Sequence, residues 1–480
     1  MKRLSVQESQ RTQWKLPPNT LLPTLLLSLL PCVSSFATSS WTGLIGVDYQ
    51  PNHYIFGNML NNHDVFYIGT NSQGTPITNI HAELSQLKAA GFNTIRSYQT
   101  TDYSWIELIN QAYAFEMNVI YEAVIPQTGS TADITAATNL LNTVINTVGL
   151  TTFNKTVTLV LAGHENYCGT CGPGGGSNIT YLTQAVSALQ GVVPNIPVSS
   201  ALVSGDLIAP PSSDITTLVN SYSTTAPLGF DPYPFQWGVP VSQAVGVLSS
   251  TSIINSIGWD YYQVEQQSFY TPPRSILMAE SGWSSAGTTN PGYACGTNCM
   301  PSISNEATYL TALYQFVKNT ANNSGVLVFE AYDEPAKVPG GTSMEDYYGV
   351  FDSDCNLKGP NNTFLIPNTS YSPTATLGCQ GFSRGALLTI VGFGHPYTLV
   401  ITQTNPVTNK NASITISNTG KPGPLADAPW PEYLVYAGAK ITIRGNPSCT
   451  STVSSINSKQ QITFSGACNC ANDNSNNCYY

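Results

Sequence analysis

Eight short apolar runs, each followed by a stretch with helical spacing, organise the chain from Trp41 to Tyr332. The runs are rich in Val, Ile, Leu and Tyr, which is typical of parallel strands that are buried on both faces. Strands that alternate with helices are joined by crossover connections. We therefore predict an α/β fold, a (β/α)8 TIM barrel, with strands at 43–49, 92–98, 118–124, 156–163, 196–203, 227–233, 275–280 and 325–332.

Apolar residues between these runs recur with the period of an amphipathic helix. Ile80, Leu84 and Leu87 form one stripe, and Gly91 stands where a C-terminal cap belongs. We expect Ser304 to cap a later helix. Two further stripes are predicted to face the core, and they consist of Ile134, Ala137, Leu141, Val144 and Val148, and of Ala307, Leu310, Tyr314 and Val317.

The last hundred residues contain only runs that resemble strands. They lie at 386–393, 397–403, 412–418, 432–436, 440–444 and 461–464. Closely spaced short strands with turn residues between them predict a small, sandwich-like all-β domain, and four cysteines lie toward its end. We expect a catalytic barrel at 38–365, a linker rich in Pro, Ser and Thr at 366–378, and this β-rich domain at 379–480.

The segment 1–37 is predicted to be a signal peptide. Basic residues precede an apolar run from Leu21 to Leu30, and small residues follow as far as Ala37. This run is ten residues long and is interrupted by Pro23, so it is too short to span a bilayer. We expect cleavage near Ala37 and a secreted or cell-surface protein without a stable membrane span, and a short anchored helix is the alternative.

Cysteine number agrees with export. The chain has 11 cysteines, and loss of Cys32 with the signal peptide leaves an even number, which indicates disulfides whose pairing stays open. The pair Cys168 and Cys171 could instead serve redox chemistry or form half of a zinc site. No His or Cys partner has a metal-binding spacing, and we predict no metal and no cofactor.

Charge limits the partners of the protein. Only 9% of residues are charged, and the formal net charge is −10. Nucleic acid is excluded as a partner, because phosphate contacts need a basic surface that 17 Lys and Arg do not supply. A neutral polysaccharide fits this balance better, and we expect the protein to act on it as a monomer.

Two glutamates end predicted barrel strands. Glu165 follows the fourth strand and Glu280 ends the seventh. Active sites of TIM barrels lie at the C-terminal ends of the strands, and a carboxylate beside a buried strand is costly without a partner or a task. Glycoside hydrolysis needs one protonated carboxylic acid and one ionised carboxylate. A structural salt bridge explains either residue alone as well as catalysis does, and the pair together favours catalysis.

Three segments resemble glycoside hydrolase family 17, especially its microbial β-1,3-glucanase and glucanosyltransferase branch. The segment 328–337, Val-Phe-Glu-Ala-Tyr-Asp-Glu-Pro-Ala-Lys, is similar to the family's eighth strand. The segment 279–284, Ala-Glu-Ser-Gly-Trp-Ser, is similar to its nucleophile strand, and 93–98, Asn-Thr-Ile-Arg-Ser-Tyr, is similar to its second strand. The resemblance implies a retaining mechanism on β-1,3-glucan, with Glu165 as acid/base and Glu280 as nucleophile.

His164 departs from the family pattern, which usually has Asn before the acid/base. That amide can donate a hydrogen bond to the sugar 2-hydroxyl. An imidazole also donates, so we expect activity with altered geometry or pH dependence. The alternatives are that His164 only fills space, or that it marks a site that binds glycan without turnover.

Other residues are predicted to surround the pair. Arg96 is expected to keep Glu280 ionised, and Tyr233 to donate a hydrogen bond to it. The resemblance places Glu330 and Lys337 near the cleft, while Asp333 and Glu334 are expected to be solvated loop charges. Aromatic rings at strand ends suit the apolar faces of glucose, and the candidates are Tyr98, Tyr233, Trp283 and Tyr332. Tyr433, Tyr436 and Trp430 could form a second glycan platform, although ordinary packing in the β-rich domain is the preferred interpretation.

Three functions remain open. The first is hydrolysis of β-1,3-glucan. The second keeps the catalytic pair but transfers the glycosyl group to another sugar, as a glucanosyltransferase does. The third is a non-catalytic glycan-binding or cell-wall protein on the same barrel. A metal-dependent hydrolase is disfavoured, because the five histidines have no ligand-like spacing.

Overall fold

A computed structural model of the chain describes most of the region after residue 40. The described residues are 41–51, 53, 64–126, 129–166, 179–208, 213–270, 274–288, 300–319, 324–335, 337–338, 341–367, 369, 371, 381–391, 397–418, 432–445, 448–470 and 477–479. The predicted signal peptide, most of the predicted linker, Trp430, Cys168 and Cys171 lie outside these residues.

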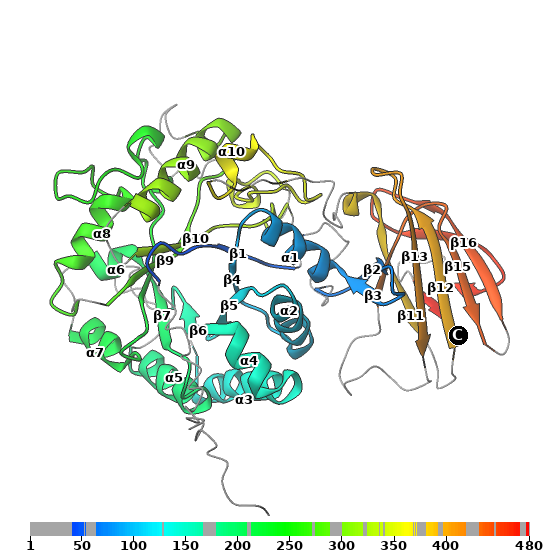
Figure 1. The fold of residues 1–480 in the computed structure, drawn as a ribbon, viewed down its shortest axis with the longest axis horizontal. Helices are drawn as coiled ribbons and strands as arrows, with labels where there is room; N and C mark the ends of the chain where they lie inside the picture. The colour runs from blue at the N-terminus through cyan, green and yellow to red at the C-terminus, as the bar shows by residue number, and fades with distance from the viewer. Residues whose placement is uncertain are drawn as a thin grey trace, which may run out of the picture. The chain divides into compact units, whose positions relative to one another are not determined.

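Eight parallel strands close into a barrel (Figure 1). Around the barrel their order is β1, β10, β9, β8, β7, β6, β5 and β4, and β4 pairs with β1 to complete the ring. The strands are β1 (Ile45–Asp48), β4 (Thr94–Ser97), β5 (Asn118–Ala123), β6 (Val157–His164), β7 (Val198–Val203), β8 (Leu228–Asp231), β9 (Ile276–Ser281) and β10 (Ser324–Val328). Each matches one of the eight predicted runs, so the predicted TIM barrel is confirmed.

The barrel strands are buried on both faces, as their continuous apolar composition requires. Every residue of β1, β4, β8, β9 and β10 is buried. Side chains of one face fill the barrel interior, and those of the other face pack against the helices. The buried polar residues of these strands, such as Arg96 and Glu280, therefore need partners inside the protein.

Helices surround the barrel (Figure 1). Their buried residues follow the predicted stripes. In α1 (Asn79–Ala89), Ile80, Leu84 and Leu87 are fully buried, and Gly91 follows the helix with φ of 94°. That positive φ is the left-handed conformation that glycine adopts without strain. The other helices are α2 (Asp102–Ala114), α3 (Thr131–Val148), α4 (Leu150–Thr156), α5 (Ile179–Val192), α6 (Ser204–Ile208), α7 (Ser213–Ser221), α8 (Ile257–Glu265), α9 (Ile303–Asn319) and α10 (Asn361–Phe364).

One predicted helix start is wrong. Helix α9 begins at Ile303, so Ser304 lies inside its first turn. The Ser302 hydroxyl accepts the hydrogen bond from the Asn305 backbone N–H at 3.1 Å, which is the capping contact. Ser302 and Ser304 have the same side chain, so only the backbone conformation decides which of them caps the helix.

The C-terminal region forms two packed β-sheets, which agrees with the predicted sandwich. One sheet has the order β13, β12, β15, β16, β17, and the other has β18, β19, β11, β14, β2, β3. A common core joins side chains of both, among them Leu388, Tyr433, Leu399 and Ile441. The strands are β11 (Ala386–Val391), β12 (Tyr397–Thr404), β13 (Asn411–Asn418), β14 (Glu432–Val435), β15 (Lys440–Arg444), β16 (Cys449–Ile456), β17 (Ile462–Gly466), β18 (Asn469–Cys470) and β19 (Asn477–Tyr479).

Strand β16 is absent from the sequence-based expectation, and its composition explains why. Its sequence is Cys-Thr-Ser-Thr-Val-Ser-Ser-Ile, which contains few apolar residues. Val453 and Ser451 are buried, while the side chains between them are less so. The strand is held by its pairing with β15 and β17 rather than by an apolar run.

Two strands from the barrel half of the sequence belong to the C-terminal sheet. Strand β2 (Tyr67–Thr70) pairs with β14 at Tyr433, and β3 (Pro76–Thr78) pairs with β2 (Figure 1). The Tyr67 and Tyr433 rings stack with centroids 5.7 Å apart. The segment 67–78, which the sequence assigned to the barrel domain, therefore contributes to both parts of the protein.

Two disulfides join described cysteines, Cys449 with Cys468 and Cys470 with Cys478. Both lie in the β-rich region, where the sequence showed four cysteines. In the part of the chain with described coordinates, no helix has the length and apolar composition needed to cross a membrane.

Candidate active site

A pocket of about 300 Å³ opens at the carboxyl ends of the barrel strands. Both predicted catalytic glutamates, Glu165 and Glu280, line it. The fold thus brings together two carboxylates that are more than 100 positions apart in the sequence. The remaining lining residues are Tyr98, His164, Tyr233, Gln236, Phe329, Glu334, Lys337 and Glu345.

Glu165 follows β6 directly and has an unusual backbone. Its φ is 46°, in the left-handed region that non-glycine residues rarely adopt. Its N–H donates to the Ala201 carbonyl at 3.1 Å, which ties this conformation to β7. Strained backbone of this kind concentrates at functional sites. Burial and the nearby Asp231 carboxylate raise the pKa of Glu165 to about 7.

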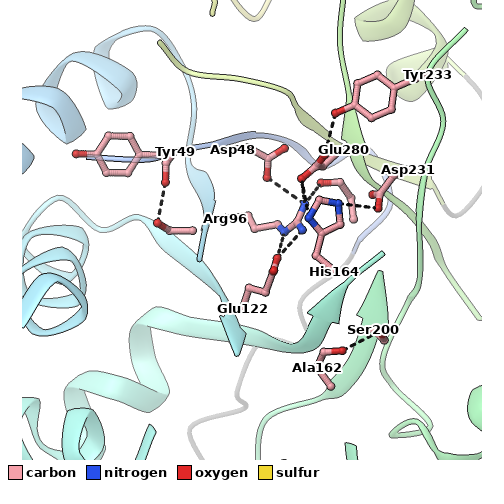
Figure 2. A network of polar contacts seen from close by, with 12 residues as sticks. Asp48, Tyr49, Arg96, Glu122, Ala162, His164, Ser200, Asp231, Tyr233 and Glu280 are labelled. Atoms are coloured by element: carbon pink, nitrogen blue, oxygen red, sulfur yellow. Dashed lines mark hydrogen bonds and ion pairs between the residues drawn. The ribbon is translucent and has the colours of Figure 1, made fainter. Parts of the chain in front are cut away.

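Arg96 is fully buried and contacts Glu280, which lines the pocket (Figure 2). Its Nη1 donates to Glu280 Oε1 at 3.0 Å and to the Ala279 carbonyl at 2.7 Å, and its Nε donates to Glu122 Oε2 at 2.8 Å. Asp48 Oδ1 lies 3.4 Å from Nη1. The guanidinium therefore links β1, β4, β5 and β9, and it supplies the positive charge beside Glu280 that the sequence predicted.

Glu280 is held by several partners from different strands. Tyr233 Oη donates to its Oε2 at 2.8 Å, and His164 Nδ1 lies 3.4 Å from its Oε1 (Figure 2). Burial acts to raise the pKa of Glu280, but the positive charges of His164 and Arg96 and the hydrogen bond from Tyr233 outweigh it. The pKa therefore lies below the usual value, and the group is ionised at neutral pH.

His164 stands between two carboxylates. Its Nε2 lies 3.3 Å from Asp231 Oδ2, at the end of β8, on the side opposite Glu280 (Figure 2). Burial lowers the pKa of His164, but Glu280 and Asp231 more than compensate and raise it to about 10.

Among the described residues, His164, Glu165 and Asp231 form a group whose ligand atoms lie within 4.8 Å of one another, close enough to hold a cation. Both ring nitrogens of His164 already face carboxylates, so we assign no metal to this group.

Lys337 lines the pocket and has four acidic neighbours, Glu330, Glu334, Glu280 and Glu345. Its Nζ is 4.2 Å from the centre of the Phe329 ring and 4.0 Å from Glu334 Oε2. Burial acts to lower the pKa of Lys337, but Glu330, Glu334 and Glu280 raise it above its usual value. The ammonium group is therefore charged, and it is available as a donor to a ligand in the pocket.

Asp333 and Glu334 are not the solvated loop charges that the sequence suggested. Asp333 is buried, and Lys358 Nζ donates to its Oδ1 at 2.8 Å. Glu334 lines the pocket. Lys358 also lies 3.2 Å from the buried Glu306 of α9, so this lysine attaches the segment after β10 to a helix. A loop has no periodic sequence pattern, so the burial of its side chains cannot be predicted from the sequence. This explains the wrong prediction for Asp333 and Glu334.

Three predicted substrate-binding residues do not line the pocket. Trp283 is fully buried between Phe235 and Tyr309. Tyr332 is also buried, and its hydroxyl donates to Gln86 Oε1 at 2.9 Å. Both rings therefore belong to the core, and the expectation of sugar platforms at these positions is not supported.

Glu330 is the third of these residues. It is buried, and burial together with Glu334 raises its pKa well above the usual value. The positive charge of Lys337 reduces this rise in the pKa of Glu330 but does not cancel it. Glu330 therefore lies beside two residues that line the pocket, Glu334 and Lys337, without lining it itself.

Tyr98 and Tyr233 do lie at the pocket, and they come from the ends of β4 and β8. The Tyr98 ring lies 5.5 Å from the Arg96 guanidinium carbon and 6.4 Å from the His164 ring. In the C-terminal region, Tyr433 and Tyr436 are buried, as the interpretation of ordinary packing expects.

Sequence reasoning missed Asp231, Gln236 and Glu345. Asp231 ends an apolar strand in the same way as Glu280, so its position was a usable signal. Gln236 follows in the turn after β8, and Glu345 lies in the 3-10 helix Met344–Asp346. Neither of these two has a local pattern that distinguishes it from a surface residue.

The arrangement supports acid/base and nucleophilic chemistry in one pocket. One carboxyl group keeps a proton near neutral pH, and the other is ionised and held by fixed donors. Pairs of acids with divergent pKa values are how a site assigns the roles of proton donor and anion.

No protein-family model and no curated protein matches the chain. Solved structures with similar folds include CJP38, a β-1,3-glucanase and allergen of Cryptomeria japonica pollen, at 17% identity and a TM-score of 0.48, covering 68% of this chain and 100% of that one. A GH5_18 protein from Bifidobacterium longum subsp. longum has 12% identity and a TM-score of 0.46, covering 67% and 77%. A fungal β-1,4-galactanase has 15% and 0.44, covering 67% and 99%. We draw no conclusion about activity from similarities this distant, and membership of family 17 stays a prediction.

Proposed function

We propose that this chain is a retaining glycoside hydrolase that cleaves β-1,3-glucan, with Glu165 as acid/base and Glu280 as nucleophile. The observation that carries the proposal is the pair of glutamates in one pocket whose pKa values are shifted in opposite directions. The proton on Glu165 goes to the glycosidic oxygen as that bond breaks. The Glu280 carboxylate forms a bond to the anomeric carbon, and Glu165 then takes a proton from the water that hydrolyses this intermediate.

The surroundings of Glu280 suit a nucleophile. Arg96 and Tyr233 hold its two oxygens separately, which fixes the plane of the carboxylate. Both partners are buried and come from barrel strands or the turns after them, so little reorganisation accompanies the reaction. The same contacts keep Glu280 ionised, which the attack on the anomeric carbon requires.

The charge of the pocket favours a neutral sugar. Glu334 and Glu345 line the pocket together with the catalytic pair. Among the described residues that line it, Lys337 and His164 are the basic ones. A uronic acid would be repelled by this excess of carboxylates, and a glucose unit would not. The rings of Tyr98 and Phe329 offer apolar surface for the sugar face. The β-1,3 linkage itself is supported by the resemblance of the strand segments to family 17.

The decisive experiment measures reducing ends released from laminarin by the wild type and by Glu280→Gln. We expect the variant to lose about 10³-fold or more of the rate, since removal of a nucleophile abolishes the covalent route. Glu265→Gln, the same change at the end of α8 outside the pocket, is the matched control and should keep the wild-type rate. Equal trace release by the wild type and Glu280→Gln would leave only a glycan-binding protein.

The same assay distinguishes hydrolysis from transfer. A defined laminari-oligosaccharide gives only shorter products on hydrolysis, while a glucanosyltransferase also gives longer ones. Proton NMR of the first products reports the anomer released. The β-anomer agrees with retention, and the α-anomer as first product contradicts the double displacement.

A further inference from the structure

His164 is held from both sides by acids, and this geometry has a chemical consequence. A neutral imidazole carries one N–H, so one of its two ring nitrogens is a lone-pair acceptor. Here Nδ1 lies 3.4 Å from Glu280 Oε1 and Nε2 lies 3.3 Å from Asp231 Oδ2. In either neutral tautomer a nitrogen lone pair would face a carboxylate oxygen. When both acids are ionised, only the doubly protonated ring presents an N–H to each of them.

Asp231 has the position of a dedicated partner. It ends β8, is 2% exposed, and neither of its carboxylate oxygens accepts a hydrogen bond from a described residue. A buried carboxylate without compensation is costly, and the two cations that act on Asp231 are His164, 3.3 Å away, and Arg96. The contact therefore neutralises Asp231 and orients the ring at the same time.

We propose that Asp231 is a positioning residue which acts through His164, holding the imidazole as a doubly protonated cation between itself and the Glu280 nucleophile, beside the Glu165 acid. The inference rests on the proposed function for its catalytic meaning. The ring then supplies a second positive charge next to Arg96, and each of its nitrogens faces a carboxylate. The family's asparagine is neutral, so His164 changes the charge of the site as well as its shape.

The charged groups that face the ring come from several strands. Glu280 from β9 and Asp231 from β8 favour the cation, and Arg96 from β4 opposes it. Glu165 directly follows His164, after the end of β6. The interactions that favour the cation outweigh those that oppose it and raise the pKa of His164 to about 10, so the ring remains a cation at neutral pH. Tyr98, the aromatic neighbour at 6.4 Å, stays neutral because burial and Glu280 raise its pKa.

The cation affects both catalytic acids in the same direction. A positive charge favours the ionised form of a neighbouring carboxyl, so it lowers the pKa of Glu280 and of Glu165. Its removal should raise both values. The acidic and basic limbs of the pH profile should then both move to higher pH, whereas a loss of packing alone would lower the rate without displacing both limbs.

The first test reads the ring directly. Protein labelled with ¹⁵N-histidine has five imidazoles, and His164→Asn identifies the signals of this one by their loss. We expect ¹⁵N shifts of a doubly protonated ring from pH 6 to pH 8. In Asp231→Asn the ring should titrate roughly one to two pH units lower, the range for loss of one close opposite charge. A neutral ring at pH 7 in the wild type overturns the proposal.

The second test uses kcat/KM against pH on an activated aryl β-glucoside. In His164→Asn both limbs should shift upward by about one unit, and the matched control His81→Asn, on α1, should leave them in place. Unmoved limbs in a folded His164→Asn variant contradict the proposal. If the wild type does not hydrolyse the glucoside, the proposed function fails. The NMR experiment on the wild type still decides the protonation state of the ring. It also decides that state if Asp231→Asn does not fold.

Discussion

Burial by itself would raise the pKa of both Glu165 and Glu280, yet the two glutamates end with opposite shifts. The difference lies in their contacts. Glu280 receives Arg96 and Tyr233, whereas Glu165 lies nearer Asp231, whose negative charge adds to the effect of burial. Residue type and strand position were visible in the sequence, but these neighbours come from strands that are distant along the chain. Roles could be assigned at first only through the family resemblance, and the neighbours now supply a physical reason.

The basic limb of the activity profile should follow Glu165. Its pKa of about 7 lies above the ordinary value, so its proton is retained at pH 5 to 6 and lost as pH rises through 7. Activity should therefore fall tenfold per unit above this point. In Glu165→Ala, an activated aryl glycoside that needs no acid should still form the intermediate, and the basic limb should vanish. A limb that stays in place would reassign the acid.

Tyr233 should affect the nucleophile through one hydrogen bond. Tyr233→Phe removes the donor to Glu280 Oε2. A hydrogen bond to a charged group contributes about 1.5–3 kcal/mol, so kcat/KM should drop roughly 10- to 100-fold. The acidic limb should move to higher pH, because the pKa of Glu280 rises. Tyr314→Phe, which loses a bond to the Phe364 carbonyl outside the pocket, is the control, and a shifted limb there would argue against a local effect.

At the scale of single elements, the segment after β10 explains how the pocket is completed. It carries Glu334, Lys337 and Glu345 into the wall, although it has no long helix or strand of its own. Its anchor is Lys358, which is buried and contacts Asp333, Glu306 and the Ser285 hydroxyl. The strand before it was predicted correctly, because an apolar run is a local signal. The anchor was not, because its partners are distributed over three segments.

Removal of this anchor should produce a pH-dependent loss of stability. Lys358→Met leaves Asp333 and Glu306 buried without their cation, at a cost of about 3–5 kcal/mol at pH 8. Burial already raises the pKa of Asp333 to about 6 and that of Glu306 well above its usual value. Carboxyls with raised pKa bind protons more tightly in the folded state, so the loss should shrink at pH 5.

Urea unfolding at the two pH values measures this difference. Lys318→Met, an exposed lysine of α9, is the matched control and should change stability by less than about 0.5 kcal/mol at both. A Lys358→Met loss that is equal at pH 5 and pH 8 would contradict the assignment of Asp333 and Glu306 as the partners.

At the scale of the whole molecule, the barrel and the C-terminal region are joined by a common apolar core and by two strands from the N-terminal half of the chain. Strands β2 and β3 extend the sheet that contains β14, and Thr70 Oγ1 donates to the Ser413 carbonyl at 2.7 Å. Phe66 contacts Phe382, with ring centroids 5.8 Å apart. The sequence placed a domain boundary near residue 366, and these contacts cross it.

A chain that ends at residue 378 should therefore be less stable than the full chain. It leaves β2 without β14 and exposes the faces of Tyr67 and Phe66, a loss of several kilocalories per mole that corresponds to a fall in Tm of roughly 5 °C or more. Thermal unfolding followed by circular dichroism measures it. Tyr433→Ala should give a smaller change of the same sign. A truncated chain that melts with the full-length protein would restore the view of independent domains.

What the sequence determined by itself is the set of barrel strands, the apolar helix stripes and the two glutamates at strand ends. These signals are local, because burial on both faces or on one helical face repeats at fixed intervals along the chain. The tertiary structure alone decided the contact of Asp231 with His164 and the burial of Trp283 and Tyr332. It also decided that β2 and β3 belong to the C-terminal sheet. Each of these depends on which distant strands become neighbours and on the direction in which side chains leave them, and neither quantity is encoded by a local pattern.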